Sequence, residues 1–360
     1  MNDLIKRRNT KTVVLNDTFI GSEYPISIQS MTNTDTHDVT STTEQILKLQ
    51  SAGCDIVRIT LPDIESIKTV YELKSNPDIK IPIVGDIHFD YKIALAAVDA
   101  GIDKIRINPG NIGDDARVKA VASACKSKGI PIRIGVNSGS VEKEILAKHG
   151  APTPEALCES ALYHASLLEK YDFTDIVISV KASSPLSTIL SYRSLATMCD
   201  YPLHLGVTEA GGAESGSIKS AVGIGTLLAE GIGDTIRVSL TADPVKEIYA
   251  AKDILSSLDL LSQKGLNIVS CPTCGRTKID LISLLDRFER AVDENGLRSK
   301  NAKVALMGCV VNGPGEAREA DIGIAGGKGE AVFFKHGKII EKISEEAIIT
   351  KLVEELKNFK

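Results

Sequence analysis

Residues 81–110 read IPIVGDIHFDYKIALAAVDAGIDKIRINPG and decide the fold class of this chain. The segments IPIVGDIH and KIRINPG are strand-like, because isoleucine recurs at alternate positions in each. Between them, YKIALAAVDAG has the apolar spacing of a helix and ends in a glycine that can cap it. The stretch is therefore one strand–helix–strand unit, the building block of α/β proteins.

The same alternation extends from the start of the chain to about Leu261. Eight units in about 260 residues predict a (β/α)8 TIM barrel. An open, doubly wound sheet is the alternative, but no G-x-G-x-x-G follows the first strand. We place the barrel at residues 1–263 and a second, small α+β domain at residues 264–360. The eight strand-like segments are PISIQSMT, DIVRIT, IPIVGDIH, KIRINPG, PIRIGVNSGS, DIVISVKAS, YPLHLGVTE and TIRVSLTAD.

Polar residues recur near the C-terminal ends of these strands, on the face opposite the apolar one. Only a barrel mouth accepts so many inward charges, because a deep unpaired charge is costly. The plain interpretation pairs each arginine with an acidic neighbour. Cations from separate strands with few carboxylates beside them instead favour a site for a phosphate or diphosphate substrate. These positions are Arg58, Thr60, Asp86, His88, Arg106, Asn108, Arg133, Asn137, Ser179, Lys181, Arg237 and Ser239.

Composition narrows the class of protein further. Hydrophobic residues make up 43% and charged residues 25% of the 360 residues, as in soluble globular proteins. A formal net charge of −5 argues against a general nucleic-acid binder. We find neither a secretory signal nor a stretch apolar enough to cross a membrane. We therefore expect a cytoplasmic protein whose seven cysteines are kept reduced.

The C-terminal segment points to metal or redox chemistry. SCPTCGRT, residues 270–277, holds Cys271 and Cys274 in C-x-x-C spacing, and GCVVNGPGEA supplies Cys309. A redox dithiol would not need Cys309, and structural zinc normally takes four Cys or His ligands. Three cysteines beside the turn NGPG favour a 4Fe-4S cluster, with structural zinc as the alternative. We interpret the remaining cysteines as buried apolar residues: Cys54, Cys125, Cys158 and Cys199.

Taken together, these motifs resemble the family of bacterial 4-hydroxy-3-methylbut-2-enyl diphosphate synthases. The resemblance spans essentially the whole chain and rests on QSMTNTDT, IRINPGN, IRIGVNSGS, HLGVTEAG, CPTCGR and GCVVNGPGEA. It is to the short, two-domain form, which lacks the central domain of plant-type members. The implied reaction is the two-electron reduction of 2-C-methyl-D-erythritol 2,4-cyclodiphosphate to (E)-4-hydroxy-3-methylbut-2-enyl diphosphate. The ring opens and the C3 oxygen leaves as water.

The resemblance also implies roles for individual residues. It implies that Glu209 donates a proton, although pairing with a neighbouring arginine is the plain alternative for this residue. It implies a 4Fe-4S cluster held by three thiolates and one carboxylate, from Cys271, Cys274, Cys309 and Glu316. It implies substrate contacts from Arg58, Arg106, Arg133, Asn137, Lys181, Arg237 and Ser239. We expect the same mouth to be lined by Asp86, His88, Asn108 and His204.

The implied partners are a small diphosphate substrate, an electron donor and a second copy of the chain. Reduced flavodoxin or ferredoxin would supply the electrons. A head-to-tail homodimer would place the cluster domain of one subunit over the barrel mouth of the other, since a short linker hinders folding back within one chain.

Other interpretations remain open from the sequence. The segment QSMTNTDT also suggests a pterin-binding barrel related to dihydropteroate synthase. A non-enzymatic sensor of a phosphate ligand, with a structural zinc domain, is a further alternative. The NGPG domain is also similar to cluster-binding pieces of sulfite and nitrite reductases, although no sirohaem-binding remainder is evident.

Overall fold

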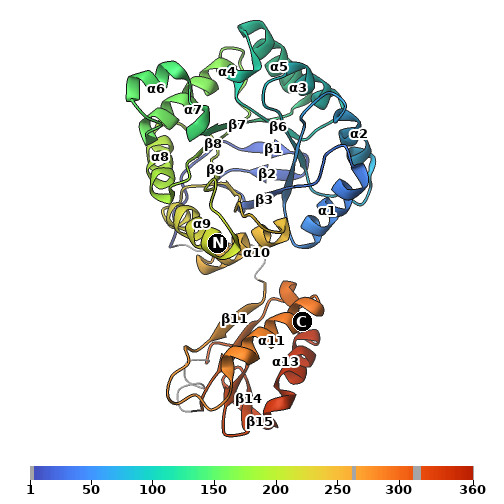
Figure 1. Cartoon of the computed structure of the whole chain (residues 1–360), viewed down its shortest axis with the longest axis vertical. Coiled ribbons are helices and arrows are strands. Elements are labelled where there is room, and N and C mark those ends of the chain that lie inside the picture. Colours follow the sequence, from blue (N-terminus) through green and yellow to red (C-terminus); the bar gives the residue numbers. More distant parts are fainter. Residues whose placement is uncertain (1–3, 262–264, 311–317, 360) are drawn as a thin grey trace. The chain divides into compact units, whose positions relative to one another are not determined.

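The computed structural model describes residues 4–261, 265–310 and 318–359 of the chain. It divides into two compact units, Met1–Leu261 and Ser262–Lys360 (Figure 1). The domain boundary predicted after residue 263 falls within residues 262–264, which lie outside the described residues.

The first unit is a parallel barrel of eight strands in the order β8-β7-β6-β5-β4-β3-β10-β9. A bridge between Ile178 and Leu203 joins β8 to the segment before β9 and completes the ring. Each strand-like segment of the sequence contains one of these strands, so the predicted TIM barrel is confirmed. The strands are β3 (Ser27–Met31), β4 (Ile56–Thr60), β5 (Ile83–Asp86), β6 (Lys104–Ile107), β7 (Ile132–Asn137), β8 (Ile176–Lys181), β9 (His204–Leu205) and β10 (Thr235–Ile236).

Helices surround this ring of strands (Figure 1), and local sequence sets their ends. The Asp114 carboxylate caps α5 by accepting from the Arg117 N–H, and Gly129 ends that helix with a φ of 64°. At the start of α7, the Thr153 hydroxyl caps the helix and Pro154 occupies its first position. The helices are α1 (Val39–Ser51), α2 (Ile67–Ser75), α3 (Tyr91–Asp99), α4 (Pro109–Ile112), α5 (Asp115–Lys128), α6 (Lys143–His149), α7 (Pro154–Glu169), α8 (Pro185–Met198), α9 (Ala213–Ala229) and α10 (Pro244–Ser257), with a 3-10 turn η1 (Ser138–Ser140).

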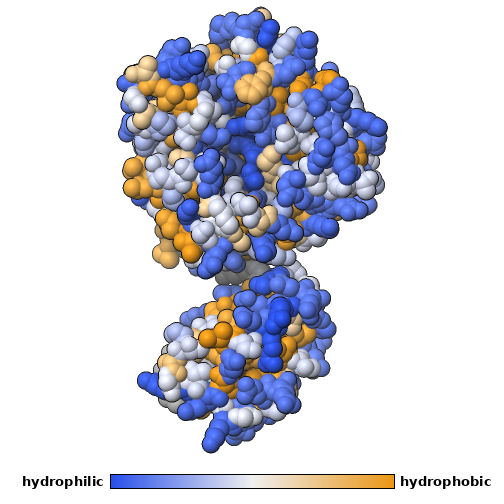
Figure 2. Space-filling model, viewed as in Figure 1, coloured by the Kyte–Doolittle hydropathy of each residue, from blue (hydrophilic) through white to orange (hydrophobic). Residues whose placement is uncertain are grey.

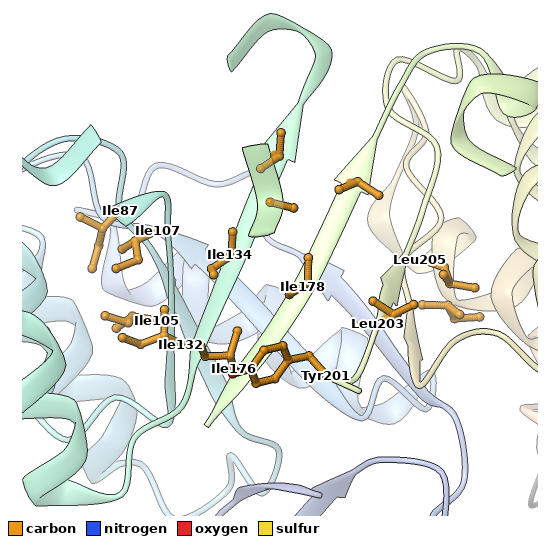
Figure 3. Close-up of a cluster of buried hydrophobic side chains, with 14 of the residues drawn as sticks. Ile87, Ile105, Ile107, Ile132, Ile134, Ile176, Ile178, Tyr201, Leu203 and Leu205 are labelled. Carbon is orange, nitrogen blue, oxygen red and sulfur yellow. The ribbon is translucent and has the colours of Figure 1, made fainter. Parts of the chain in front are cut away.

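The outward face of the barrel strands forms the main core. Isoleucines at alternate positions, such as Ile132 and Ile134 of β7 and Ile176 and Ile178 of β8, are 0% exposed (Figure 3). Complete burial of one such side chain contributes about 1.5–3 kcal/mol. Because these alternate positions face the helices, the positions between them must face the barrel interior.

The cysteines of the barrel are consistent with the apolar role predicted for them. Cys54, Cys125 and Cys158 are buried, and Cys199 is half-buried. Burial raises the pKa of the Cys54 and Cys125 thiols to about 12, so these thiols stay protonated at neutral pH.

A hairpin that the sequence analysis did not predict fills one end of the barrel. It consists of β1 (Val13–Leu15) and β2 (Thr18–Ile20), and Asn16 turns the chain with a φ of 47°. Its side chains pack against Ile56, Val84 and Val177, which lie near the starts of their strands. The hairpin therefore occupies the amino-terminal end, and inward polar side chains gather toward the carboxyl-terminal end.

The second unit is an α+β domain with a five-stranded sheet in the order β11-β12-β13-β14-β15. The first three strands are parallel, and β13, β14 and β15 are antiparallel neighbours. Apolar residues of α11 and α13, such as Phe288 and Leu352, pack with residues of the sheet in one core. The elements are β11 (Asn267–Ser270), α11 (Leu281–Glu294), η2 (Leu297–Ser299), β12 (Lys303–Met307), β13 (Ile322–Gly326), β14 (Glu330–Lys335), β15 (Lys338–Ser344), η3 (Glu345–Ala347) and α13 (Ile348–Lys357).

Candidate active site

Inward cations gather in the carboxyl-terminal half of the barrel. Strand register gives the arrangement, because residues paired across parallel strands point to the same side. Arg106 of β6 pairs with Asp86 of β5 and with Arg133 of β7, and Lys181 of β8 pairs with Asn137 of β7. Hydrophilic residues occupy the centre of the barrel in the space-filling view (Figure 2).

Asp86 is the carboxylate around which two of these arginines are arranged. Its oxygens lie 3.2 Å from Arg106 Nη1 and 3.7 Å from Arg58 Nε, with His88 Nε2 at 3.8 Å. Burial alone would raise the pKa of Asp86, but Arg58 and Arg106 bring it below its usual value. The plain interpretation of an arginine with an acidic neighbour therefore applies in part to Arg58 and Arg106.

Arg133 has no such carboxylate beside it among the described residues. It is 1% exposed, and its Nη1 donates to Ser179 Oγ at 2.7 Å. Its Nε and Nη2 find no hydrogen-bond partner in the described part of the chain. Burial and the nearby Arg58 lower its pKa well below the usual value, because a charge without a partner is costly away from water. An anion at this point would satisfy the remaining donors of Arg133.

Lys181 and Arg237 extend the basic surface around the ring. Lys181 is buried, and burial together with Arg133 and Arg237 lowers its pKa well below the usual value. Arg237 lies directly after β10, with Nη2 3.5 Å from Glu247 Oε1. These cations repel one another in a poorly solvated space, so they favour an anionic ligand that relieves the repulsion.

Glu247 is a site residue that the sequence analysis missed. It lies in the first turn of α10 and is buried at 3% exposure. One carboxylate oxygen accepts from the Leu240 N–H at 3.0 Å, and the other accepts from Ser30 Oγ at 2.9 Å. Glu247 thereby fastens the loop after β10 to β3 beside Arg237. An acid at a helix start is common in sequences, so position alone gave no signal for this role.

A deeper polar layer, also missed in part, lies inside the barrel. Lys104 and Gln29 are almost completely buried, and their side-chain polar atoms have no hydrogen-bond partner within the described residues. His204, predicted to line the mouth, is 0% exposed, and its Nδ1 lies 3.4 Å from Thr235 Oγ1. Burial and the neighbouring Lys181 lower the pKa of His204 well below its usual value, so its ring is neutral at pH 7.

Two inward glycines, which have no side chain, provide the space in which the side chains of Arg106 and Lys181 lie. A methyl group added at Gly135 of β7 would lie 2.4 Å from Arg106 Nε, and Arg106 Nη2 donates to the Gly135 carbonyl at 2.8 Å. A methyl group at Gly206 would lie 2.7 Å from Lys181 Nζ. The Gly135 N–H also donates to Asn108 Oδ1 at 3.1 Å, which holds that predicted residue in place.

The other predicted residues of the barrel lie at the strand ends or in the loops that follow. Asn137 ends β7, and its backbone N–H donates to Ser140 Oγ at 3.0 Å. His88 is 54% exposed in its side chain, and Ser239 is half-buried. Glu209 is exposed and has a φ of 54°, a left-handed conformation that a glutamate seldom adopts. Such conformations are concentrated at functional sites.

In the second unit, the strand topology brings the predicted cysteines to one edge of the sheet. Cys271 follows β11, and Cys309 lies two residues after β12, which is parallel to β11. The Gly308 N–H donates to Cys271 Sγ at 3.2 Å. The Lys278 N–H donates to the Gly308 carbonyl at 2.9 Å, which joins the loop after β11 to the loop after β12. Cys274, in the first of these loops, is exposed.

Ligand geometry for a metal is not complete in the described chain. Within residues 4–261, 265–310 and 318–359, no three Cys, His, Asp or Glu side chains form a group that could hold a metal ion. The predicted carboxylate ligand, Glu316, lies outside the described residues. The donor set of thiols and the N–H···S bond to Cys271 fit an iron–sulfur site, where such bonds to sulfur are usual.

The helices of the described residues also bear on membrane insertion. None is both long enough and apolar enough to cross a bilayer.

Fold and site together define a class of protein: a (β/α)8 barrel with inward cations near its carboxyl-terminal end, and an α+β domain whose cysteine loops follow neighbouring parallel strands. Residues 10–252 match the protein family described as "GcpE TIM-barrel domain", and residues 267–358 match the family described as "GcpE protein C-terminal domain". The chain therefore belongs to the GcpE family, and the predicted family resemblance is confirmed.

Curated relatives cover nearly the whole chain. A protein of Ruminiclostridium cellulolyticum is 57% identical over 356 residues, which is 99% of each chain. A protein of Clostridium perfringens is 56% identical over 349 residues, or 97% of this chain and 98% of that one. Both are named 4-hydroxy-3-methylbut-2-en-1-yl diphosphate synthase (flavodoxin).

Solved structures of lower identity share the fold alone. A sialic acid synthetase of Leptospira borgpetersenii matches with a TM-score of 0.50 at 11% identity, over 79% of this chain and 98% of that one. The HPPK-DHPS protein of Plasmodium falciparum matches with a TM-score of 0.51 at 13% identity, over 79% of this chain and 54% of that one.

Proposed function

We infer that this protein is an oxidoreductase that converts 2-C-methyl-D-erythritol 2,4-cyclodiphosphate to (E)-4-hydroxy-3-methylbut-2-enyl diphosphate. The observation that carries this function is the 57% identity, over 99% of the chain, to a relative named for that product. The reaction consumes two electrons and protons, opens the cyclic diphosphate and releases one water. The inward cations of the barrel are the chemical counterpart of a doubly phosphorylated substrate.

In this proposal the barrel binds and orients the substrate. Arg133, with donors that lack partners among the described residues, and Lys181 face the diphosphate together with Arg58, Arg106 and Arg237. Each charge-assisted hydrogen bond contributes about 1.5–3 kcal/mol. Because Asp86 and Glu247 already hold three of the arginines, the cations need little rearrangement when substrate arrives. Asn137 and Ser239 add neutral donors near the strand ends. Asn108, His88 and His204 are further neutral groups proposed to line the same mouth.

The second unit would carry a 4Fe-4S cluster. We propose Cys271, Cys274 and Cys309 as thiolate ligands and Glu316 as the carboxylate ligand. The placement of the cysteine loops at one sheet edge supports the three thiolates. A bound cluster supplies electrons one at a time, and an iron with an exchangeable oxygen ligand supplies Lewis acidity for the departing oxygen.

Glu209 is the proposed proton donor. It follows the seventh barrel strand, is exposed, and is held in a left-handed backbone conformation. A carboxyl group at this position can deliver a proton to the oxygen that leaves as water.

The proposed partners follow from the same reaction. The relatives' name supports reduced flavodoxin as the electron donor, with ferredoxin as the related alternative. We further propose a head-to-tail homodimer in which the cluster domain of one subunit serves the barrel of the other.

The first experiment is purification without oxygen, followed by assays of iron and acid-labile sulfide and by a visible spectrum. The proposal expects about four of each per chain and broad brown absorption. Turnover of the cyclodiphosphate with dithionite, and then with reduced flavodoxin, should yield the linear diphosphate. Zinc without sulfide, or cluster-loaded protein that leaves the cyclodiphosphate unchanged, would contradict the proposed function.

A further inference from the structure

The carboxyl-terminal edge of the parallel strands in the second unit is a distinct surface. We call it the cysteine edge and define it by residues 271–280, 308–310 and 327–330, which follow β11, β12 and β13. Its loops contact one another: a methyl group added at Gly308 would lie 2.8 Å from Thr277 Cγ2. A methyl group at Gly326 would lie 2.7 Å from Ile279 Cγ1 and 3.0 Å from the Gly308 carbonyl. The three loops therefore form one continuous surface.

Three exposed cations lie on this edge. Arg276, Lys278 and Lys328 are exposed, and none of them forms an ion pair with a described residue. The acidic residues of the same loops are Glu330 and Asp280, and of these Glu330 is paired with a cation. Glu330 accepts from Lys342 Nζ at 2.7 Å, and the Asp280 carboxylate accepts from the Ser283 N–H at the start of α11.

This local charge is opposite to that of the molecule as a whole. The chain carries a formal net charge of −5, so the three cations form a basic area on an acidic protein. Arg276 and Lys278 follow Cys274 by two and four residues and lie in the same loop. A redox partner that approached the cysteines would therefore meet these cations first.

We propose that the cations of the cysteine edge, Arg276, Lys278 and Lys328, dock a small acidic electron carrier of the flavodoxin type. The proposal rests on the proposed function, which places the electron acceptor at these cysteines. Electron-transfer complexes bury small interfaces and rely on charge complementarity for fast encounter. Three exposed cations beside the proposed acceptor supply that complementarity, and they direct the carrier to the loop that holds Cys271 and Cys274.

The test uses charge reversal in the full-length, cluster-loaded protein. In Arg276→Glu/Lys278→Glu we expect the Kd for oxidised flavodoxin, measured by calorimetry at low salt, to rise about tenfold or more. The apparent KM for reduced flavodoxin should rise with it. Because the exposed charges are screened over about 10 Å at 0.1 M salt, added salt should weaken the wild-type complex and remove most of this difference.

Lys338, at the opposite end of the strands of the same sheet, provides a matched control. Lys338 is exposed and begins β15, next to the turn after β14. Since β14 runs antiparallel to β13, that turn lies at the end of the sheet away from the cysteines. We expect Lys338→Glu to leave the Kd and the KM for flavodoxin unchanged. An equal effect of Lys338→Glu would show that only net charge matters and would overturn the proposal.

Dithionite separates this proposal from the proposed function. If charge reversal weakens flavodoxin binding while the iron content, the spectrum and dithionite-driven turnover stay at wild-type levels, docking at the cysteine edge is supported. If flavodoxin binds the double variant and Lys328→Glu as tightly as the wild type, the docking proposal fails although the enzyme function stands. Should the double variant lose its cluster, Lys328→Glu alone decides, because Lys328 lies outside the C-x-x-C loop.

Discussion

At the scale of single residues, Glu247 shows how a buried acid can support an anion site. Its two short hydrogen bonds hold the loop after β10, whereas its contact to Arg237 is longer, at 3.5 Å. Holding the loop is therefore its main contribution. We expect Glu247→Ala to lower the free energy of unfolding by about 1–3 kcal/mol, because the Leu240 N–H loses its acceptor. The KM for the cyclodiphosphate should rise about tenfold as Arg237 loses its position.

Glu247→Gln is the matched variant, because it keeps an acceptor oxygen and removes the charge. We expect it to retain the KM within about twofold and most of the stability. Steady-state kinetics and denaturant unfolding on the three proteins measure both effects. If the glutamine variant were impaired as much as the alanine variant, the charge on Glu247 would be the essential feature.

Lys104 gives the opposite case, because this inward lysine destabilises the folded barrel. It is 0% exposed, and burial with the nearby Arg133 lowers its pKa well below the usual 10.5. We expect Lys104→Met to raise the free energy of unfolding by about 1–3 kcal/mol at pH 7, because a polar amine without a described partner is removed. Because folding lowers this pKa, the unfolded chain binds a proton at this lysine more readily than the folded chain does. The gain should therefore shrink as pH rises toward 10.5.

Thermal unfolding without substrate, followed between pH 7 and pH 10, measures the Lys104 effect. Lys126→Met is the control, since Lys126 is exposed on α5 and its replacement should change stability by less than about 0.5 kcal/mol. A loss of stability in Lys104→Met would mean that the amine has polar partners inside the barrel, such as ordered water.

The inward cations could be predicted from the sequence for a simple reason. Residues two apart on a strand share a face, so Arg58 and Arg106 had to point away from the isoleucines beside them. The carboxylates near them were harder to assign. Asp86 lies on a strand and was recognised as lining the mouth, but its bonding to two arginines depends on strand register. Glu247 comes from a helix and carries no strand periodicity.

At the scale of elements, strand β7 is built around a glycine. Gly135 leaves room for the Arg106 guanidinium, and a methyl group there would lie 2.4 Å from Arg106 Nε. We expect Gly135→Ala to displace Arg106 and to raise the KM for the cyclodiphosphate at least tenfold, while the barrel still folds. Kinetics with dithionite as the reductant and circular dichroism measure the two effects.

Gly225→Ala is the control for that prediction. Gly225 lies inside α9, where an added methyl group would be 3.9 Å from the nearest side-chain atom. Alanine there should leave the KM unchanged and add about 0.5–1 kcal/mol of stability through helix propensity. An unchanged KM in Gly135→Ala as well would mean that the space beside Gly135 does not determine the position of Arg106.

The elements themselves show where sequence patterns stop being informative. The strand-like segments YPLHLGVTE and TIRVSLTAD contain strands of two residues, β9 and β10, because the chain beyond them turns into loops that carry Glu209 and Arg237. The hairpin β1–β2 was not predicted, since two strands of three residues are too short for periodicity to stand out. Its effect, to fill the amino-terminal end, depends on contacts distant in sequence.

At the scale of the whole molecule, the proposed reaction requires one cation-lined barrel and one cysteine edge to act on the same substrate. In a head-to-tail dimer each working site would draw its barrel from one subunit and its cysteines from the other. Mixing Cys271→Ser subunits with Arg133→Ala subunits therefore separates the two arrangements. A shared site leaves each mixed dimer one intact barrel opposite intact cysteines, whereas a site within one chain leaves none.

With random exchange of subunits at equal amounts, half of the dimers are mixed, and a shared site predicts about a quarter of the wild-type activity per chain. The complementary mixture is wild type with the double variant Cys271→Ser/Arg133→Ala. There a shared site predicts about a quarter, because only wild-type dimers work, and a site within one chain predicts about half. Dithionite-driven turnover after exchange, with dimer composition checked by mass spectrometry, measures both mixtures. Zero activity in the first mixture and half in the second would place the site within a single chain and contradict the shared arrangement.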